Sequence, residues 1–267
     1  MSFSGQIKLE RHAMHELDAV NKNTYEKSNV VDIYAQRNKL QPPERKIFRI
    51  LKPKLSTMKM LDIGIGAGRT TSYFAPLVKE YTGVDYSKSM IDYCKKRFKS
   101  NSNYKFEIAD SRSLKLFEDK YYDFVLFSFN GMDFILPEER EMAFKEMERV
   151  CKSNGTICFS SHNLLSVGRA HIYWRNPKSI LAGLQPLMNK EKINTIATND
   201  IVIRDGGEGI NNNLKICYIN PSIQLKYLKD KGYYDIKMFN LNGFEIANLR
   251  KVCKCTDPWL YYLYKIR

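Results

Sequence analysis

The sequence predicts an α/β fold: a doubly wound, mostly parallel seven-stranded sheet with helices on both faces, plus an N-terminal helical segment and an inserted lid after the fifth strand. Two observations lead to this prediction. From Met58 onward, short apolar runs alternate with longer amphipathic ones, which is typical of βαβ units around a parallel sheet. The 267 residues are 43% hydrophobic and 12% aromatic, so the chain can bury a sizeable core.

Residues 1–57 are expected to form an N-terminal helical cap. A helix is predicted around Gln6–Asn21, and a tyrosine-containing segment follows at Tyr25–Leu40. The Pro42-Pro43 pair should open a second helix, because proline suits the first helical position.

Residues 58–163 supply the regular alternation and are expected to form the ligand-binding core. Strands are predicted at Lys59–Gly64, Tyr81–Val84, Lys105–Ile108, Phe124–Phe129 and Thr156–Ser161, and helices near Thr70–Lys79, Ser89–Lys99 and Glu138–Cys151. In an open parallel sheet, ligands lie beyond the carboxyl ends of the strands, so the residues that follow these strands are the candidates for chemistry.

Residues 164–213 break the periodicity and contain Pro177, Pro186 and the Gly206-Gly207 pair. This segment is predicted to be an inserted lid or substrate segment. Regularity returns over residues 214–267, which should complete the core. The elements predicted there are strands at Leu214–Ile219, Asp235–Leu241 and Trp259–Lys265 and a helix at Pro221–Lys231.

The composition excludes several classes of protein. The 43 Lys and Arg against 29 Asp and Glu give a net charge of +14, but the lysines are spread along the chain, so a nucleic-acid partner stays open and is not favoured. The longest apolar stretch, Phe124–Leu136, is shorter than the roughly 20 residues that span a bilayer. Without a leader pattern or a C-x-x-C pair, we expect a cytoplasmic chain with six reduced cysteines and no membrane partner.

The most informative segment is residues 60–69, where a predicted strand leads directly into Gly64-x-Gly66-x-Gly68 and then into a helix. Glycines let the backbone turn tightly and approach a ligand. Asp62 precedes the loop, and Asp85 and Asp110 end the next two predicted strands. Carboxylates there can accept ribose hydroxyls and an adenine amine, so the three strand ends together fit an adenosine-containing ligand.

At this point the sequence resembles the class I S-adenosylmethionine-dependent methyltransferases, over about residues 58–161 and more loosely over the C-terminal strands. The resemblance implies S-adenosyl-L-methionine as cofactor and S-adenosyl-L-homocysteine as product. It places Asp62 and the three glycines at the methionine end of the cofactor and Asp85 at the ribose. The adenine contacts that it implies are Tyr86, Met90, Asp110 and Ser111.

Further contacts are expected from other segments. N-terminal segments in this family often fold over the cofactor, so Tyr25, Tyr34 and Arg37 are a candidate set, in which a phenol and the guanidinium could bind its carboxylate. Groups that position the reacting atoms should stand at Phe129 and Asn130, where nucleobase-methylating relatives often carry Asn-Pro-Pro-Tyr. Because this chain lacks that motif, it looks more like the small-molecule methyltransferases.

Three alternatives were weighed. A nicotinamide-dependent dehydrogenase also uses a glycine-rich loop, but its fingerprint needs glycine where this chain has Arg69. An RNA methyltransferase is the alternative that the positive charge suggests. A non-catalytic protein that binds the cofactor and regulates a partner is the alternative from another class.

A hydroxyl acceptor needs a base to remove its proton, and two histidines are candidates. His162 follows a predicted strand at its ligand-facing end, and His171 lies inside the insertion. Asp133 with Asn163 is a conceivable Mg²⁺ pair, but the other oxygen ligands are not identifiable, so we predict no metal.

The acceptor is predicted to be a small molecule. Basic residues in or near the insertion suggest that it carries an anionic group: Arg169, Arg175, Lys178 and Arg204. A sugar, a nucleotide-sugar or a natural product would meet both requirements. The sequence leaves the oligomeric state open.

Overall fold

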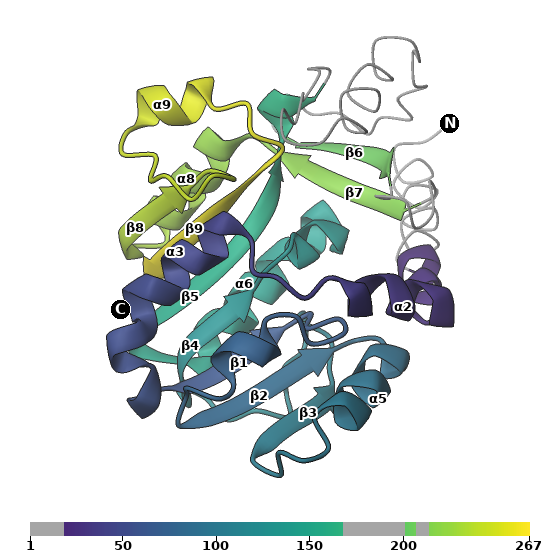
Figure 1. The fold of residues 1–267 in the computed structure, drawn as a ribbon. Coiled ribbons are helices and arrows are strands. Elements are labelled where there is room, and N and C mark those ends of the chain that lie inside the picture. The colour runs from purple at the N-terminus through teal and green to yellow at the C-terminus, as the bar shows by residue number, and fades with distance from the viewer. Residues whose placement is uncertain (1–18, 168–200, 207–213) are drawn as a thin grey trace.

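The computed structural model describes residues 19–167, 201–206 and 214–267, and Figure 1 shows their arrangement. Residues 19–25 are helical. The helices that follow are α2 (Ser28–Gln36), α3 (Pro42–Leu51), α4 (Thr71–Phe74), α5 (Lys88–Arg97), α6 (Arg140–Val150), α8 (Pro221–Asp230) and α9 (Leu249–Lys254). Short 3-10 turns are η1 (Lys52–Thr57), η2 (Gly131–Phe134), η3 (Pro137–Glu139) and η4 (Leu164–Ser166). The strands are β1 (Lys59–Ile63), β2 (Glu80–Asp85), β3 (Tyr104–Ile108), β4 (Tyr122–Phe127), β5 (Cys151–Asn163), β6 (Ile201–Gly206), β7 (Leu214–Ile219), β8 (Tyr234–Phe239) and β9 (Trp259–Lys265).

Within the described residues, nine strands form one connected sheet. The five strands β3-β2-β1-β4-β5 are parallel and lie side by side in that order. β9 runs antiparallel beside β5, and β8 runs antiparallel beside β9. Seven strands therefore follow the order β3-β2-β1-β4-β5-β9-β8, in which β9 alone runs against the rest. The predicted doubly wound, mostly parallel sheet is confirmed.

The other two strands, β6 and β7, form an antiparallel hairpin. β7 pairs only with His162 and Asn163 at the end of β5, whereas β4 pairs with β5 only as far as Phe159. His162 also pairs with β9, on the opposite edge of β5. β7 therefore lies on the same edge of β5 as β4 and pairs with the part of β5 that extends beyond β4. The hairpin therefore lies at the carboxyl end of the central strands, which is where ligands are expected.

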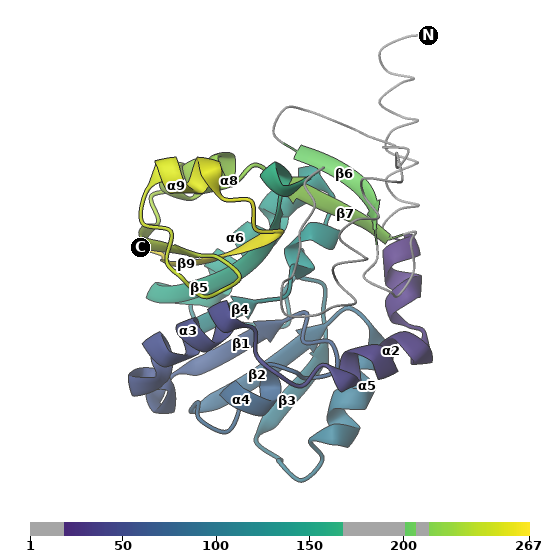
Figure 2. The ribbon, with the colours of Figure 1, turned by 45° about the horizontal axis from the view of Figure 1, so that its top comes forward.

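Helices cover both faces of the sheet (Figures 1 and 2). On one face, Leu61 of β1 shares a core with Phe144 of α6 and Leu228 of α8. On the other face, Met60 shares a core with Ile47 of α3, and α4 and α5 contribute to the same cluster. The neighbours Met60 and Leu61 point to opposite faces, as the two-residue period of a strand requires. The result is a three-layer arrangement of helices, sheet and helices.

Polar caps and prolines start several helices where the sequence predicts them. α3 begins at the proline pair, and Gln41 and Glu44 form a capping box, in which the Gln41 backbone N–H donates to the Glu44 carboxylate at 2.7 Å. α8 begins at Pro221 after Asn220, whose side chain accepts from the backbone N–H of Ser222. These caps satisfy backbone groups that have no partner inside the helix.

Some boundaries differ from the predictions. The helix predicted over Thr70–Lys79 is only α4, because Pro76 cannot donate a backbone hydrogen bond and its ring crowds the preceding turn. β4 ends at Phe127, since Phe129 and Asn130 take left-handed φ angles of 57° and 63°. β6 was not predicted and lies inside the segment predicted as an insertion. The division of the chain into four parts stays a prediction.

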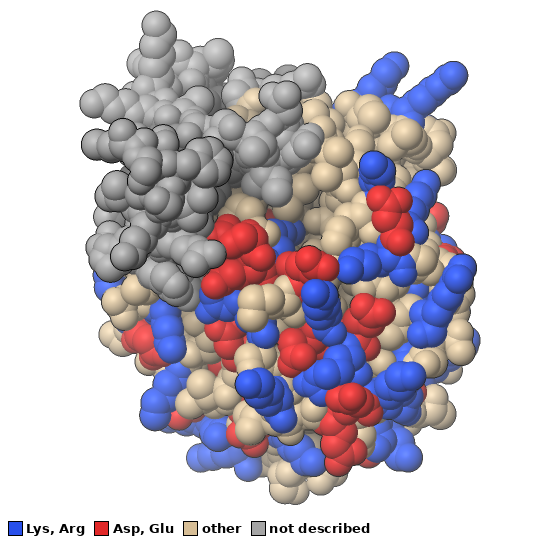
Figure 3. Space-filling model, turned by 180° about the vertical axis from the view of Figure 1, so that it is seen from behind, with Lys and Arg blue, Asp and Glu red and all other residues tan. Residues whose placement is uncertain are grey.

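The face of the molecule in Figure 3 carries mixed charge. Figure 3, which shows the side opposite to Figure 1, has Lys and Arg interspersed with Asp and Glu over the described residues. This distribution follows from the scattered lysines of the sequence. None of the described helices combines the length and the hydropathy that a membrane-spanning helix requires.

Candidate functional site

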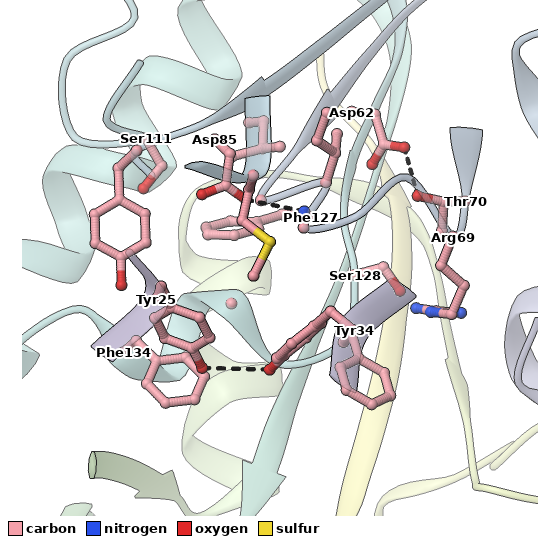
Figure 4. Close-up of a pocket in the computed structure, with 18 of the residues that line it drawn as sticks. Tyr25, Tyr34, Asp62, Arg69, Thr70, Asp85, Ser111, Phe127, Ser128 and Phe134 are labelled. Atoms are coloured by element: carbon pink, nitrogen blue, oxygen red, sulfur yellow. Dashed lines mark hydrogen bonds between the residues drawn. The ribbon is translucent and has the colours of Figure 1, made fainter. Parts of the chain in front are cut away.

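One pocket lies where the parallel strands of the sheet end (Figure 4). Its walls come from the glycine-rich loop after β1, from the residues that follow β2, β3 and β4, and from the N-terminal segment around α2. The sheet topology explains this meeting, because the carboxyl ends of parallel strands share one edge.

The glycine-rich loop passes between aromatic rings. Gly64, Gly66 and Gly68 have φ angles of 64°, 52° and 79°, a region in which other residues are strained. A Cβ atom on Gly64 would lie 2.9 Å from the Phe127 ring, and one on Gly66 would lie 3.3 Å from the Tyr34 ring. A Cβ atom on Gly68 would instead meet the C-cap of α5 at 2.5 Å. The first two glycines therefore shape the pocket, and the third lets the loop pack on α5.

Asp62 of β1 is buried beneath this loop. Its Oδ2 accepts hydrogen bonds from the Thr70 hydroxyl at 2.6 Å and from the Tyr81 hydroxyl at 2.8 Å. Burial raises the pKa of Asp62 to about 7, although both hydroxyls favour the ionised form. A cationic ligand group nearby would therefore favour loss of the proton near neutral pH.

Asp85, the last residue of β2, ties the loop to the start of α5. Its Oδ2 accepts from the backbone N–H of Gly66 at 2.9 Å, and its Oδ1 accepts from that of Ser87 at 2.9 Å. Burial raises the pKa of Asp85 to about 6, and the two backbone donors oppose this rise. Since an ionised carboxylate has about four acceptor positions, further hydroxyl donors can bind to it.

Asp110, after β3, is paired with Arg112. The Arg112 Nε lies 3.0 Å from both carboxylate oxygens of Asp110, and the same guanidinium reaches Glu139. Burial alone would raise the pKa of Asp110, but the Arg112 hydrogen bonds and charge lower it. Between Asp85 and Asp110, the lining is apolar at Met90, which is almost fully buried. This part of the pocket lining therefore combines an apolar side chain with two acids.

Aromatic rings from the N-terminal segment cover the pocket. Tyr25 lies edge-on to Tyr34, Tyr86 and Phe134, with ring centroids 5.8, 6.0 and 5.5 Å away. The Tyr25 and Tyr34 hydroxyl oxygens are 3.4 Å apart, as Figure 4 shows. Ile216 of β7 packs into the same cluster, so α2 and the hairpin enclose the pocket together.

Two guanidinium groups lie against the ring of Phe129. The Arg37 Cζ is 5.1 Å and the Arg69 Cζ 4.8 Å from the centroid of this ring, within the range of cation–π contacts. Arg69 also forms a buried ion pair with Glu44, whose carboxylate accepts from the hydroxyl of Ser128 as well. The helix cap of α3, the glycine-rich loop and the end of β4 are therefore joined by one carboxylate.

A second polar group lies behind the pocket wall, at the ends of β4 and β5. The Nδ1 of His162 is 2.8 Å from Oδ2 of Asp133, and its Nε2 is 3.4 Å from Nδ2 of Asn130. Arg140 donates to Oδ1 of Asp133 at 2.8 Å. The side chain of Asn163 donates to two backbone carbonyls instead, so it points away from Asp133.

Comparison with known proteins agrees with this geometry. Residues 60–155 match the family model described as "Methyltransferase domain". The chain is 31% identical over 106 residues to "Uncharacterized methyltransferase YcgJ" of Bacillus subtilis (strain 168), which covers 39% of this chain and 40% of that protein. It is 34% identical over 106 residues to "Demethylmenaquinone methyltransferase" of Staphylococcus aureus (strain MRSA252), covering 38% of this chain and 41% of that protein. The matched region thus spans about two fifths of the length of each of these two relatives.

The fold of the whole described chain also has solved counterparts. The 1,6-didemethyltoxoflavin-N1-methyltransferase of Burkholderia thailandensis, solved with 1,6-didemethyltoxoflavin and S-adenosylhomocysteine, aligns with a TM-score of 0.58. The alignment covers 95% of this chain and 90% of that chain at 13% identity. Residues 60–155 thus resemble the methyltransferase domain family, and the chain has the fold of a solved methyltransferase that binds S-adenosylhomocysteine. The predicted resemblance is therefore confirmed.

The pocket brings most of the predicted site residues together. Those that line the pocket are Tyr34, Arg37, Asp62, Gly64, Gly66, Asp85, Tyr86, Met90, Asp110, Ser111 and Phe129. Gly68, Asn130 and His162 lie outside the lining, with Asn130 placed between the lining residues Phe129 and Gly131. His171 falls outside the described residues. The roles of all these residues stay predictions.

The sequence reasoning left several residues of the pocket lining without a role: Arg69, Thr70, Arg112, Phe127, Ser128 and Phe134. A signal existed for some of them. Thr70 follows the glycine loop by two residues, and Phe127 and Ser128 end the fourth predicted strand, where ligands are expected. Phe134 reaches the pocket only through the packing of distant segments.

Proposed function

We propose that this chain is an S-adenosylmethionine-dependent methyltransferase whose acceptor is the hydroxyl group of a small molecule. The arrangement around Asp85 carries the proposal. This acid ends β2, holds the glycine-rich loop through Gly66, and keeps acceptor positions for a ribose at the edge of the pocket.

The residues present fit the cofactor. Tyr34 and Phe127 lie so close to the glycine-rich loop that a side chain there would fill the space. In the proposed arrangement, Asp62 and the loop hold the methionine end, Asp85 holds the ribose hydroxyls, and Met90 with Ser111 borders the adenine. Arg37, over the Phe129 ring, is the proposed partner of the methionine carboxylate. The bound cofactor would supply an electrophilic methyl group on a sulfonium.

A small-molecule acceptor is supported by the enclosure of the pocket. Tyr25, Tyr34 and Phe134 cover it, and an aromatic cover of this kind excludes water and limits the size of an acceptor. The Burkholderia thailandensis relative binds a small molecule, and the Staphylococcus aureus relative is named for one. The mixed charges in Figure 3 favour this choice over a nucleic acid, which would require a clustered basic surface.

A hydroxyl acceptor is supported by His162. An alcohol needs a base as its oxygen attacks the methyl group, and imidazole is suited to this role near neutral pH. His162 is the penultimate residue of β5, behind the pocket wall, and its Nε2 contacts Asn130, whose neighbours Phe129 and Gly131 line the pocket. In the proposed reaction the aromatic cover aligns the acceptor, and His162 takes the proton. The anionic character that we predict for the acceptor rests on the sequence alone.

Calorimetric titration with S-adenosylhomocysteine and S-adenosylmethionine tests the cofactor assignment, with NAD as the negative ligand. We expect micromolar binding of the adenosyl ligands, which corresponds to about −8 kcal/mol. Asp85→Asn should weaken it about tenfold or more, equivalent to ~1.4 kcal/mol, because the carboxylate loses its charge and one oxygen. Asp92→Asn is the matched control, since this acid lies exposed on α5.

Binding of NAD in place of the adenosyl ligands would overturn the cofactor assignment. The acceptor is tested separately, with methyl-labelled S-adenosylmethionine and small-molecule, RNA and protein fractions. Label in a small-molecule product that mass and NMR spectra identify as a methyl ether supports a hydroxyl acceptor, whereas an N-methyl or C-methyl product would contradict it. Label only in RNA would overturn the small-molecule assignment and leave the cofactor assignment standing. Cofactor binding without label in any fraction would indicate a non-catalytic protein.

A further inference from the structure

Asp133 is the centre of a buried hydrogen-bond network behind the pocket. Its side chain is fully buried, and each carboxylate oxygen faces two donors. Oδ1 accepts from Arg140 Nη1 at 2.8 Å and from the Ser161 hydroxyl at 2.6 Å. Oδ2 accepts from the backbone N–H of His162 at 2.5 Å and lies 2.8 Å from the Nδ1 of the same residue.

These four contacts determine which nitrogen of His162 carries hydrogen. A carboxylate paired with an arginine is ionised and can only accept hydrogen bonds. The contact between Asp133 and Nδ1 is therefore a hydrogen bond only if Nδ1 is protonated. In the neutral ring, Nε2 then has the free electron pair. The Asn130 Nδ2 group, 3.4 Å from Nε2, is a donor and agrees with this assignment.

The Asn130 side chain holds Nε2 only weakly. Its contact with Nε2 is long for a hydrogen bond, and its Oδ1 is buried with no hydrogen-bond partner among the described residues. An unpaired buried acceptor is costly, and such groups often mark functional positions. The backbone of Asn130 has a left-handed φ, and its neighbours Phe129 and Gly131 line the pocket. The amide of Asn130 is therefore the contact at Nε2 that an acceptor hydroxyl would have to replace.

We propose that Asp133 is a positioning residue that holds His162 as the Nδ1–H tautomer. Nε2 is then the atom that accepts the proton of the hydroxyl acceptor, and this proton transfer rests on the proposed function. The acceptor O–H bond breaks and an Nε2–H bond forms. The electron pair stays on the acceptor oxygen, which bonds to the methyl carbon as the sulfonium–methyl bond breaks and leaves its pair on sulfur. The imidazolium is then paired with Asp133, while Arg140 keeps the other carboxylate oxygen occupied.

The tautomer is measured without cofactor or acceptor, by two-bond ¹H–¹⁵N correlation spectra of the histidine rings in the labelled full chain. At pH about 8 a histidine of ordinary pKa is neutral. We expect a protonated Nδ1 and an unprotonated Nε2 for His162. The signal is assigned by its loss in His162→Gln, and independently by removing the other three histidines of the sequence one at a time. A protonated Nε2 with a bare Nδ1 in the wild-type spectrum would overturn the proposal.

Two variants separate the contributions of the neighbours. Asn130→Ala removes the donor at Nε2 and should leave the tautomer unchanged, whereas Asp133→Asn should shift it toward Nε2–H. If Asp133→Asn fails to fold, the wild-type spectrum still decides the tautomer. If the His162 ring changes to the Nε2–H tautomer in Asn130→Ala, then Asn130, and not Asp133, determines the tautomer.

Lowering the pH should then add the second proton at Nε2. Among the described residues, the charged or titratable groups around the ring are Asp133 of η2, Arg140 of α6 behind it, and Tyr218 of β7, whose ring centroid lies 4.9 Å away. A ring that stays neutral over the whole range in which the chain is folded would overturn the role of His162 as proton acceptor. Because these spectra need no ligand, failure here is distinguishable from failure of the cofactor titration.

Discussion

Two buried acids make the site dependent on pH at the scale of single residues. Burial raises the pKa of Asp62 to about 7 and that of Asp85 to about 6, both above the ordinary value of 3.8. The folded chain therefore holds protons that the unfolded chain has already released between pH about 4 and 7. The stability that these two acids contribute is fully present below that window and is lost as the pH rises through it.

Asp62→Asn tests this dependence. The difference in free energy of unfolding between the variant and the wild type should shift in favour of the variant between pH 4 and 8, by at most roughly 4 kcal/mol if the Asp62 pKa is about 7. Denaturant titrations at several pH values measure the shift. Asp92→Asn, on the surface, should show little such shift. A constant difference for Asp62→Asn would mean that Asp62 has an ordinary pKa.

Cofactor binding should have the opposite pH dependence. The proposed ligand brings an ammonium and a sulfonium group toward Asp62 and ribose hydroxyls toward Asp85, and both contacts favour the ionised acids. The affinity for S-adenosylmethionine should therefore increase as the pH rises from about 5 to 8. Titration calorimetry at several pH values checks this, and in Asp62→Asn the increase should be smaller. Affinity that falls over this range would contradict the proposed contacts.

Gly64 of the glycine-rich loop can be compared with Gly232, which lies outside the loop and has a similar positive φ angle. Gly64→Ala combines an unfavourable φ with a Cβ 2.9 Å from the Phe127 ring, whereas Gly232→Ala, at φ 76°, meets nothing within 4 Å. We expect about 1 kcal/mol of destabilisation for Gly232→Ala from strain alone, and about 1–3 kcal/mol more for Gly64→Ala. Thermal unfolding measures both, and equal losses would show that Phe127 yields to the added methyl group.

At the scale of elements, Glu44 joins three parts of the chain. It caps α3, pairs with Arg69 of the glycine-rich loop, and accepts from Ser128 after β4. Removing one partner of a buried ion pair leaves the other charge uncompensated. The capping residue Glu44 therefore also holds Arg69 of the loop in place, although the two residues lie 25 positions apart in the sequence.

Glu44→Ala should lower the free energy of unfolding by about 3–5 kcal/mol, because it leaves the Arg69 guanidinium buried without its carboxylate. In the double variant Glu44→Ala/Arg69→Met, we expect part of this loss to be recovered, since the unpaired charge is gone. Glu141→Ala, which breaks two exposed ion pairs with Lys145 and Lys231, should lower the free energy of unfolding far less, because solvent screens such pairs. Additive effects in the double variant would argue against direct coupling between Glu44 and Arg69.

How far the sequence predicts each element depends on whether its signal is local. The strand–glycine–helix motif and the acids at Asp85 and Asp110 are local, and the structure places them around one pocket as expected. The start of α3 at its proline pair was predicted from the sequence, but the use of Glu44 as the partner of Arg69 was not. β6 carries a β-branched run at residues 201–203, which favours a strand, yet its isolation between irregular segments concealed it.

At the scale of the whole molecule, the unpredicted part of the site comes from packing between distant segments. Tyr25 and Val31 of the N-terminal segment share a cluster with Met90 of α5 and Ile216 of β7. No periodicity records such a contact, because each partner only shows an apolar residue on one face. The sequence therefore predicted the floor of the pocket, built by the strand ends, and the resemblance suggested Tyr34 and Arg37 above it, but the packing of the cover against β7 was not predicted.

This packing predicts that the cover responds to the cofactor as a unit. In the proposed arrangement, S-adenosylhomocysteine binds against Tyr34 and the glycine-rich loop. It should therefore slow amide hydrogen exchange in the loop, and also in α2 and β7, because residues of α2 and β7 pack in one shared cluster. α9, none of whose residues lines the pocket, should not change. Tyr34→Ala should remove the protection of α2 and β7 and retain part of that in the loop, whereas Tyr234→Ala, on the surface of β8, should remove neither. Protection confined to the loop in the wild type would mean that the cover and the cofactor site act independently.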